Sequence, residues 1–106
     1  MGKRVLLVCG GGASTGFLAQ AITNAANNEG YDYEIFARPV DMLDGLVNEI
    51  DVLLIAPHFK FREKELIEKA NDNDVCCGVI DSLAYGTMDG KTILNQINDL
   101  IGGKNE

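Results

Sequence analysis

The chain has 106 residues, a length that suits one domain able to bury a core without metal or disulfide support. Its 46% hydrophobic and 24% charged residues match ordinary soluble globular proteins, and a formal net charge of −7 argues against nucleic acid as a partner. No apolar run approaches the ~18 residues needed to cross a bilayer and no secretory signal is visible, so we expect a cytoplasmic protein without direct membrane insertion.

The first predicted elements lie between Val5 and Leu18, in the segment VLLVCGGGASTGFL. Four consecutive branched aliphatic residues are typical of a strand buried on both faces. Downstream, Ile22 and four alanines repeat with helical spacing. The segment therefore predicts a strand, a glycine-rich loop and a helix, with Cys9 at the entrance of that helix.

The entrance of a helix favours negative charge. Its first backbone N–H groups have no intrahelical partners and lie at the positive end of the helix dipole, and the glycines at 10–12 let the backbone curl around an anion. The hydroxyl of Ser14 or Thr15 can cap the helix or donate to a phosphate. Cys9 is therefore a candidate nucleophile with a lowered pKa.

A glycine-rich loop after a first strand also occurs in nucleotide and flavin sites, and buried cysteines are common. This loop lacks the GK[ST] ending of a Walker A motif, and its glycines are out of register with G-x-G-x-x-G. A cysteine at its head points instead to a covalent phosphoryl acceptor.

The rest of the chain alternates between strands and helices. We expect an edge strand over 31–39, a short weak helix over 42–50 and a buried strand over 51–56. An amphipathic helix with a solvated charged face is expected over 61–70 and a fourth strand over 75–80. A connection over 81–86 and a last helix over 89–101 complete the chain. Gly102 and Gly103 are expected to end the last helix. The domain would then span 1–101, and 102–106 would be a frayed tail.

The three cysteines suggest free thiols, because their number is odd and no export signal accompanies them. Cys76 and Cys77 are adjacent in a predicted strand, so their side chains should face opposite sides of the sheet and pack as small hydrophobic groups. Zinc is not expected, since only His58 could join them and no C-x-x-C spacing exists. We expect neither a metal nor a cofactor.

Alternating strands and helices imply right-handed crossovers and a parallel sheet with helices on both faces. Such sheets bind ligands beyond the carboxyl ends of their strands. The segments expected at that edge are the Cys9 loop, Arg38 with Pro39, Pro57 with His58, and 81–85.

Three functions fit a cysteine loop at this edge. A phosphatase with the C-x5-R loop uses its arginine to clamp the phosphate, but Thr15 stands at that position here. The missing arginine favours a phosphoryl carrier over a low-molecular-weight phosphatase-like hydrolase. The third candidate is a redox or ligand-binding flavodoxin-like domain in which Cys9 is incidental.

The chain resembles enzyme IIB of the bacterial phosphoenolpyruvate:sugar phosphotransferase system, in the lactose/cellobiose/chitobiose family. The resemblance runs from Lys3 to Ile101 and is carried by CGGGASTGFL, VLLIAPHF and VIDSLAYGTMDGKTIL. The loop here is richer in glycine than is usual, with the small Ala13, and His58 stands after Pro57 where glutamine is familiar.

The resemblance implies a single α/β domain, a flavodoxin-like or phosphatase-like three-layer sandwich whose four-stranded parallel sheet has the order 2-1-3-4. It implies a monomeric phosphotransferase that takes a phosphoryl group from a phosphohistidine of enzyme IIA. The group would pass to a sugar, such as cellobiose, chitobiose or lactose, during uptake through membrane enzyme IIC. Cys9 would be phosphorylated, and the phosphate would be held by Gly10, Gly11, Gly12, Ala13, Ser14, Thr15 and Gly16.

Three further side chains are candidates for the border of this site. His58 could hydrogen-bond the phosphate, although a loop histidine is often a solvated surface residue. Asp81 could border the site or cap the turn after the fourth strand, and Tyr85 lies close to it in sequence.

Overall fold

The computed structural model describes residues 3–9 and 14–104, but not the side chains of Cys9, Ser14, Thr15, His58, Lys60 and Lys104. Within these ranges four parallel strands form one sheet in the order β2-β1-β3-β4. The strands are β1 (Lys3–Cys9), β2 (Tyr33–Pro39), β3 (Val52–Ile55) and β4 (Cys76–Val79). The predicted strand order is confirmed.

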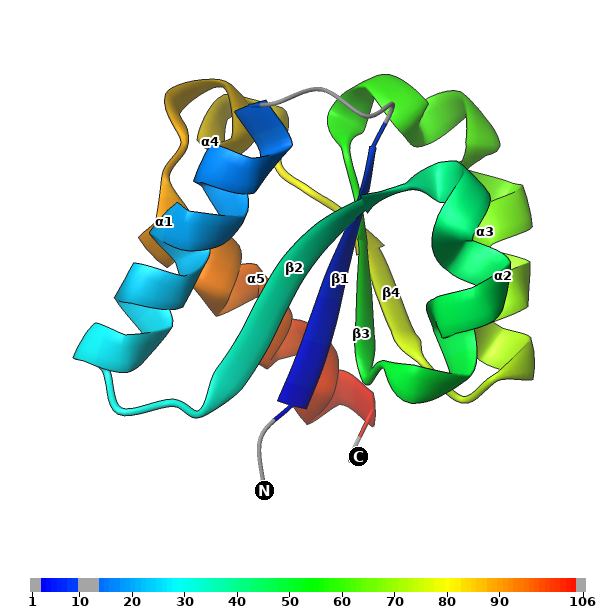
Figure 1. Cartoon of the computed structure of the whole chain (residues 1–106), viewed down its shortest axis with the longest axis horizontal. Coiled ribbons are helices and arrows are strands. Elements are labelled where there is room, and N and C mark those ends of the chain that lie inside the picture. The colour runs from blue at the N-terminus through cyan, green and yellow to red at the C-terminus, as the bar shows by residue number, and fades with distance from the viewer. Residues whose placement is uncertain (1–2, 10–13, 105–106) are drawn as a thin grey trace.

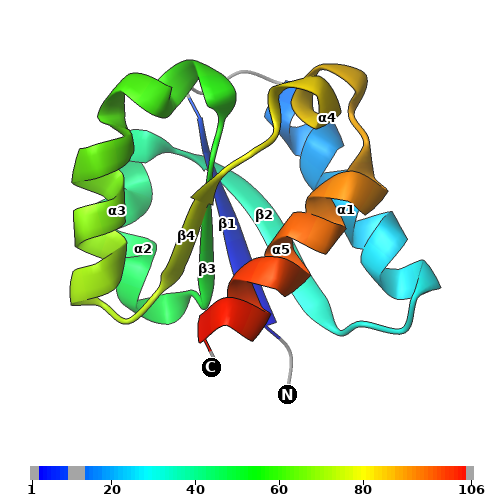
Figure 2. The same cartoon turned by 180° about the vertical axis from the view of Figure 1, so that it is seen from behind.

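Helices cover both faces of the sheet, as Figure 1 and Figure 2 show. One face carries α1 (Ser14–Asn28), α4 (Ser82–Thr87) and α5 (Gly90–Lys104). The other carries α2 (Leu43–Leu46) and α3 (Glu63–Asp72), joined to the strands by the 3₁₀ helices η1 (Val40–Met42), η2 (Val47–Glu49) and η3 (Pro57–Arg62). The expected three-layer sandwich is therefore present.

The sheet separates two apolar cores because successive residues of a strand face opposite sides. In β1, Val5 and Leu7 pack with residues of α1 and α5, whereas Leu6 and Val8 pack with residues of α2 and α3. All four of these side chains are fully buried. The run of branched aliphatic residues thus forms a central strand covered on both faces, as the sequence predicts.

The adjacent cysteines follow the same alternation. Cys76 packs against the core on the α1 and α5 side, and Cys77 against the core on the α2 and α3 side. Burial is the main cause that raises the pKa of Cys77 to about 12. Cys77 is therefore protonated at neutral pH and packs as a small hydrophobic group, which confirms the structural interpretation of this thiol.

The segment 81–86, predicted as a connection, instead contains helix α4. A side-chain oxygen of Asp81 accepts a hydrogen bond from the backbone N–H of Ala84 at 3.0 Å, which caps the amino end. Met88 adopts a left-handed conformation with φ of 53°, which ends the helix. A helix of six residues is too short to reveal a helical period in the sequence.

The last helix also differs from the prediction. Gly102 and Gly103 do not end it, because α5 continues to Lys104. A glycine inside a helix costs about 1 kcal/mol relative to alanine, which weakens a helix without stopping it. The predicted weak helix around Gly45 is confirmed, because that stretch is divided into η1, α2 and η2.

Candidate functional site

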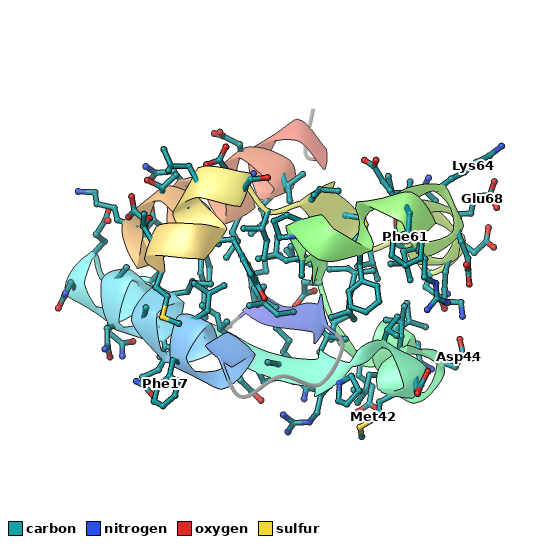
Figure 3. All side chains as sticks on the ribbon, turned by 90° about the horizontal axis from the view of Figure 1, so that it is seen from above. Phe17, Met42, Asp44, Phe61, Lys64 and Glu68 are labelled. Carbon is teal, nitrogen blue, oxygen red and sulfur yellow. The ribbon has the colours of Figure 1, made fainter. Side chains whose placement is uncertain are left out.

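The carboxyl ends of the four strands meet at one edge of the sheet. Cys9 at the end of β1 is in register with Pro39 of β2, and Ile55 of β3 is in register with Val79 of β4. The segments that follow these ends lead into α1, η1, η3 and α4. Figure 3 looks down on this edge. The predicted grouping of these segments at one edge is confirmed for the described backbone.

Cys9 is the last residue of β1, and α1 begins at Ser14. The predictions for Gly10, Gly11, Gly12 and Ala13 lie outside the described residues, as do those for the side chains of Cys9, Ser14 and Thr15. In the described backbone, residues 10–13 are all that separates Cys9 from the first turn of a 15-residue helix. That turn holds no acidic residue, so no carboxylate there offsets the positive end of the helix dipole.

Gly16, in the first turn of α1, leaves open space. Apart from its chain neighbours and the backbone of the helix itself, no atom of the described residues lies within 4 Å of the position where a Cβ atom would stand. The next residue, Phe17, exposes 69% of its surface and extends outward from α1 in Figure 3. Gly16 and Phe17 are therefore accessible to an incoming protein.

Asp81 and Tyr85 have structural contacts of their own. The carboxylate of Asp81 caps α4, and its backbone N–H donates to Oε1 of Gln96 at 3.0 Å. Tyr85 is half-buried against the α1 and α5 core. It lines a cavity of about 190 Å³ with Leu18 of α1, Gly86 and Met88. Tyr85 of α4 thus faces α1. A role for Asp81 or Tyr85 at the border of the site stays a prediction.

Two other expected residues belong to segments at the neighbouring strand ends. His58 belongs to η3, and its side chain lies outside the described part of the chain. The guanidinium of Arg38 stands over the ring of Phe36 at 5.3 Å and donates to the carbonyl oxygen of Ala37 at 2.7 Å. These contacts hold Arg38 along β2.

The sequence analysis missed Gln96 of α5. Its Nε2 donates to the carbonyl oxygen of Val79 at 3.3 Å, and its Oε1 accepts from the N–H of Asp81 at 3.0 Å. The side-chain amide thus pairs with the outer edge of β4 as a neighbouring strand would. Gln96 thereby fixes the turn that leads into α4. The sequence offers no signal for this contact, because Gln96 is only one polar residue beside an apolar helical stripe.

The described residues form neither a metal cluster nor a membrane-spanning helix. Within 3–9 and 14–104, no three His, Cys, Asp or Glu side chains are grouped as metal ligands. In the same ranges, no helix combines the length and apolar character needed to cross a membrane.

Comparison with known proteins gives a consistent family. A family model described as "PTS system, Lactose/Cellobiose specific IIB subunit" matches residues 4–96. The oligo-beta-mannoside-specific EIIB component of Bacillus subtilis (strain 168) is 33% identical over 99 residues, which cover 93% of this chain and 96% of that protein. The cellobiose-specific EIIB component of Lactococcus lactis subsp. lactis (strain IL1403) is 34% identical over 104 residues, with the same coverage of both chains.

Two solved structures share the fold. The lactose-specific IIB domain from Streptococcus pneumoniae superposes with a TM-score of 0.84 at 17% identity, over 93% of this chain and 97% of that one. The solution structure of the cellobiose-specific IIB component from Borrelia burgdorferi gives a TM-score of 0.80 at 32% identity, over 98% and 95%.

Proposed function

Since this chain belongs to the lactose/cellobiose-specific IIB family of the sugar phosphotransferase system, we propose that Cys9 is the residue that carries its phosphoryl group. The components of this family are phosphotransferases that act in the transfer of phosphate to sugar. The observation that carries the proposal is the place of Cys9. It ends the central strand β1 at the carboxyl edge, immediately before the loop that enters α1.

The phosphoryl donor in this proposal is a phosphohistidine of enzyme IIA. The Cys9 thiolate attacks phosphorus, an S–P bond forms, and the P–N bond to the histidine breaks. The electron pair of that bond stays on the imidazole nitrogen, which can take the proton that the thiol has lost. Transfer is then complete without water.

The amino end of α1 supplies the anion site. Backbone N–H groups of residues 10–16, with the hydroxyls of Ser14 and Thr15, hold the phosphoryl oxygens and stabilise the thiolate before transfer. The open surface at Gly16 and the lack of acidic residues in the first turn of α1 support this assignment.

The second step passes the group to a sugar bound by membrane enzyme IIC. A sugar hydroxyl oxygen attacks phosphorus and loses its proton, and the electrons of the S–P bond return to Cys9. Relatives of this chain include EIIB components of oligo-beta-mannoside, cellobiose and galactose systems. We propose a β-linked disaccharide such as cellobiose, chitobiose or lactose, with the chain acting as a monomer in the cytoplasm. A phosphatase-like role is disfavoured because Thr15 replaces the arginine of the C-x5-R loop.

Intact-mass measurement after incubation with phosphorylated enzyme IIA tests the proposal. We expect one added phosphoryl group on the wild-type chain and none on Cys9→Ser. Cys76→Ser and Cys77→Ser are matched controls that should still be labelled, because both residues lie inside β4 and pack against the cores. Labelling that persists in Cys9→Ser would move the site to another residue, with His58 the first to examine.

A further inference from the structure

Exposed large apolar side chains occur mainly in the segments that follow the carboxyl ends of the strands, the edge at which β1 ends with Cys9. Six large apolar side chains are exposed among the described residues, and five of them lie in the segments after the carboxyl ends of the strands: Phe17, Met42, Phe61, Leu83 and Met88. The sixth, Tyr31, lies near the opposite edge, just before β2. Grouped apolar side chains on a protein surface mark contact with another molecule.

Two of these side chains belong to what we call the α2–α3 flank, which consists of Met42, Phe61 and the charged groove described below. Phe61 exposes 81% of its surface and Met42 exposes 48%. Met42 ends η1 directly before α2, and Phe61 lies in η3 just before α3, so each stands where one of the two helices begins. Figure 3 shows Met42 and Phe61 on the same side of the molecule, away from Phe17.

The groove of this flank is strongly acidic. It holds about 480 Å³ between α2 and α3 and is lined by four carboxylates and one ammonium group, those of Asp44, Glu65, Glu68, Asp72 and Lys69. Lys69 is paired with Asp44, and Arg62 is paired with Glu65 at 2.9 Å. Glu68 and Asp72 have no ion-pair partner among the described residues. The groove therefore carries negative charge available to a basic partner.

We propose that the α2–α3 flank docks the cytoplasmic surface of membrane enzyme IIC, with Phe61 and Met42 as apolar anchors and the acidic groove facing lysine and arginine side chains. The proposal rests on the proposed function, which requires Cys9 to meet a membrane protein. Cytoplasmic loops of membrane proteins carry an excess of lysine and arginine, so their charge complements this groove.

The same charge argues against two other occupants. The anionic lipids of the cytoplasmic leaflet repel an acidic surface, so the flank suits a protein and not the bilayer. A second copy of this chain would place two acidic grooves face to face, which opposes association. A basic protein surface with apolar positions at its centre satisfies both parts of the flank.

Co-sedimentation with inverted membrane vesicles that contain enzyme IIC tests this docking. The wild-type chain should bind these vesicles, and vesicles that lack IIC should not retain it. Phe61→Ser should raise the apparent Kd roughly tenfold, as for the loss of an anchor residue. The double variant Glu68→Lys/Asp72→Lys should raise it by a similar factor. Salt screens charge pairs, so binding of the double variant should also weaken less with added salt than binding of the wild type does.

Matched controls come from the segment that precedes β2, on another side of the molecule from α3. Tyr31→Ser removes another exposed aromatic side chain, and Asp32→Lys reverses another exposed charge. Both should bind IIC vesicles as the wild type does. All variants should be phosphorylated by enzyme IIA at the wild-type rate, because the flank is assigned to IIC alone.

The outcomes separate this docking from the proposed function. Failure of enzyme IIA to phosphorylate the wild-type chain would overturn the role of Cys9, whatever the vesicles show. Equal binding of wild type, Phe61→Ser and the double variant would overturn the docking. Retention by vesicles without IIC would assign the flank to lipid. Slower phosphorylation of the flank variants by enzyme IIA would assign it to the donor protein.

Discussion

Gly90 stands where α5 begins against the backbone of α1, and alanine does not fit there. A Cβ atom on Gly90 would lie 2.4 Å from the carbonyl oxygen and 2.6 Å from the carbonyl carbon of Ala21, and 2.9 Å from the nitrogen of Ile22. These are backbone atoms of a hydrogen-bonded helix, so relief requires a shift of α1 or α5 as a whole. Gly90→Ala should therefore destabilise the domain.

The size of the loss follows from two opposing effects. Overpacking a well-packed core costs typically about 1–3 kcal/mol, and a clash with backbone puts Gly90→Ala at the upper end. Alanine is favoured over glycine in a helix by about 1 kcal/mol, which offsets part of this cost. We expect a net loss of about 2 kcal/mol, a substantial part of the ~5–15 kcal/mol that stabilises a typical domain. The Tm should fall by roughly 10 °C.

Urea unfolding followed by far-UV circular dichroism measures this loss. Gly102→Ala is the matched control, because Gly102 lies in the same helix and, chain neighbours and helix backbone aside, no atom of the described residues lies within 4 Å of its added Cβ. That variant should gain about 0.5–1 kcal/mol. Equal stability of the two variants would refute the close approach of α1 and α5 at Gly90.

Four other outcomes are expected. Iodoacetamide should alkylate Cys9 faster than Cys76 or Cys77 near neutral pH, and phosphate or sulfate should slow that reaction; a rate equal to that of a free thiol in a peptide, insensitive to either anion, would contradict the anion site. Burial raises the pKa of Cys77 from 9.0 to about 12, so the stability that the neutral thiol contributes should be complete below pH 9 and lost between pH 9 and 12. The free energy of unfolding, measured as a function of pH, should therefore fall less over this range in Cys77→Ala than in the wild type. Asp81→Ala should cost about 1 kcal/mol in thermal unfolding, whereas Asp81→Asn should keep the cap and most of the stability. The isolated chain should not turn over p-nitrophenyl phosphate, and steady hydrolysis that disappears in Cys9→Ser would favour the phosphatase.

Strand positions were predictable because burial on two faces leaves a strong mark on sequence. The aliphatic runs of β1 and β3 are continuous, and the half-exposed β2 alternates, so each strand was identified from its own residues. Helix α4 was missed because its causes are a single cap by Asp81, the left-handed Met88 and the burial of Ala84. Ala84 is the one buried residue of α4, and a single buried residue shows no helical period.

The candidate site, too, could be predicted from the sequence only in part. Placing Cys9 at the carboxyl edge requires only that a parallel strand end at that residue. The contact of Gln96 with Val79 and Asp81 joins residues 15 to 17 positions apart through the docking of α5, and no local pattern encodes it. The acidic groove likewise exists only because α2 lies beside α3.

A carrier that uses Cys9 must avoid hydrolysis of its phosphocysteine. A phosphocysteine reacts with water quickly only if a site aligns the water and stabilises the charge that grows in the transition state. Backbone N–H groups at the start of α1 that bind ground and transition states equally do not accelerate that step. An exposed phosphoryl group can therefore persist in the proposed mechanism. In the proposed docking, enzyme IIC covers Phe61 and would exclude water when the group passes to the sugar, so this apolar side chain serves the reaction only within that complex.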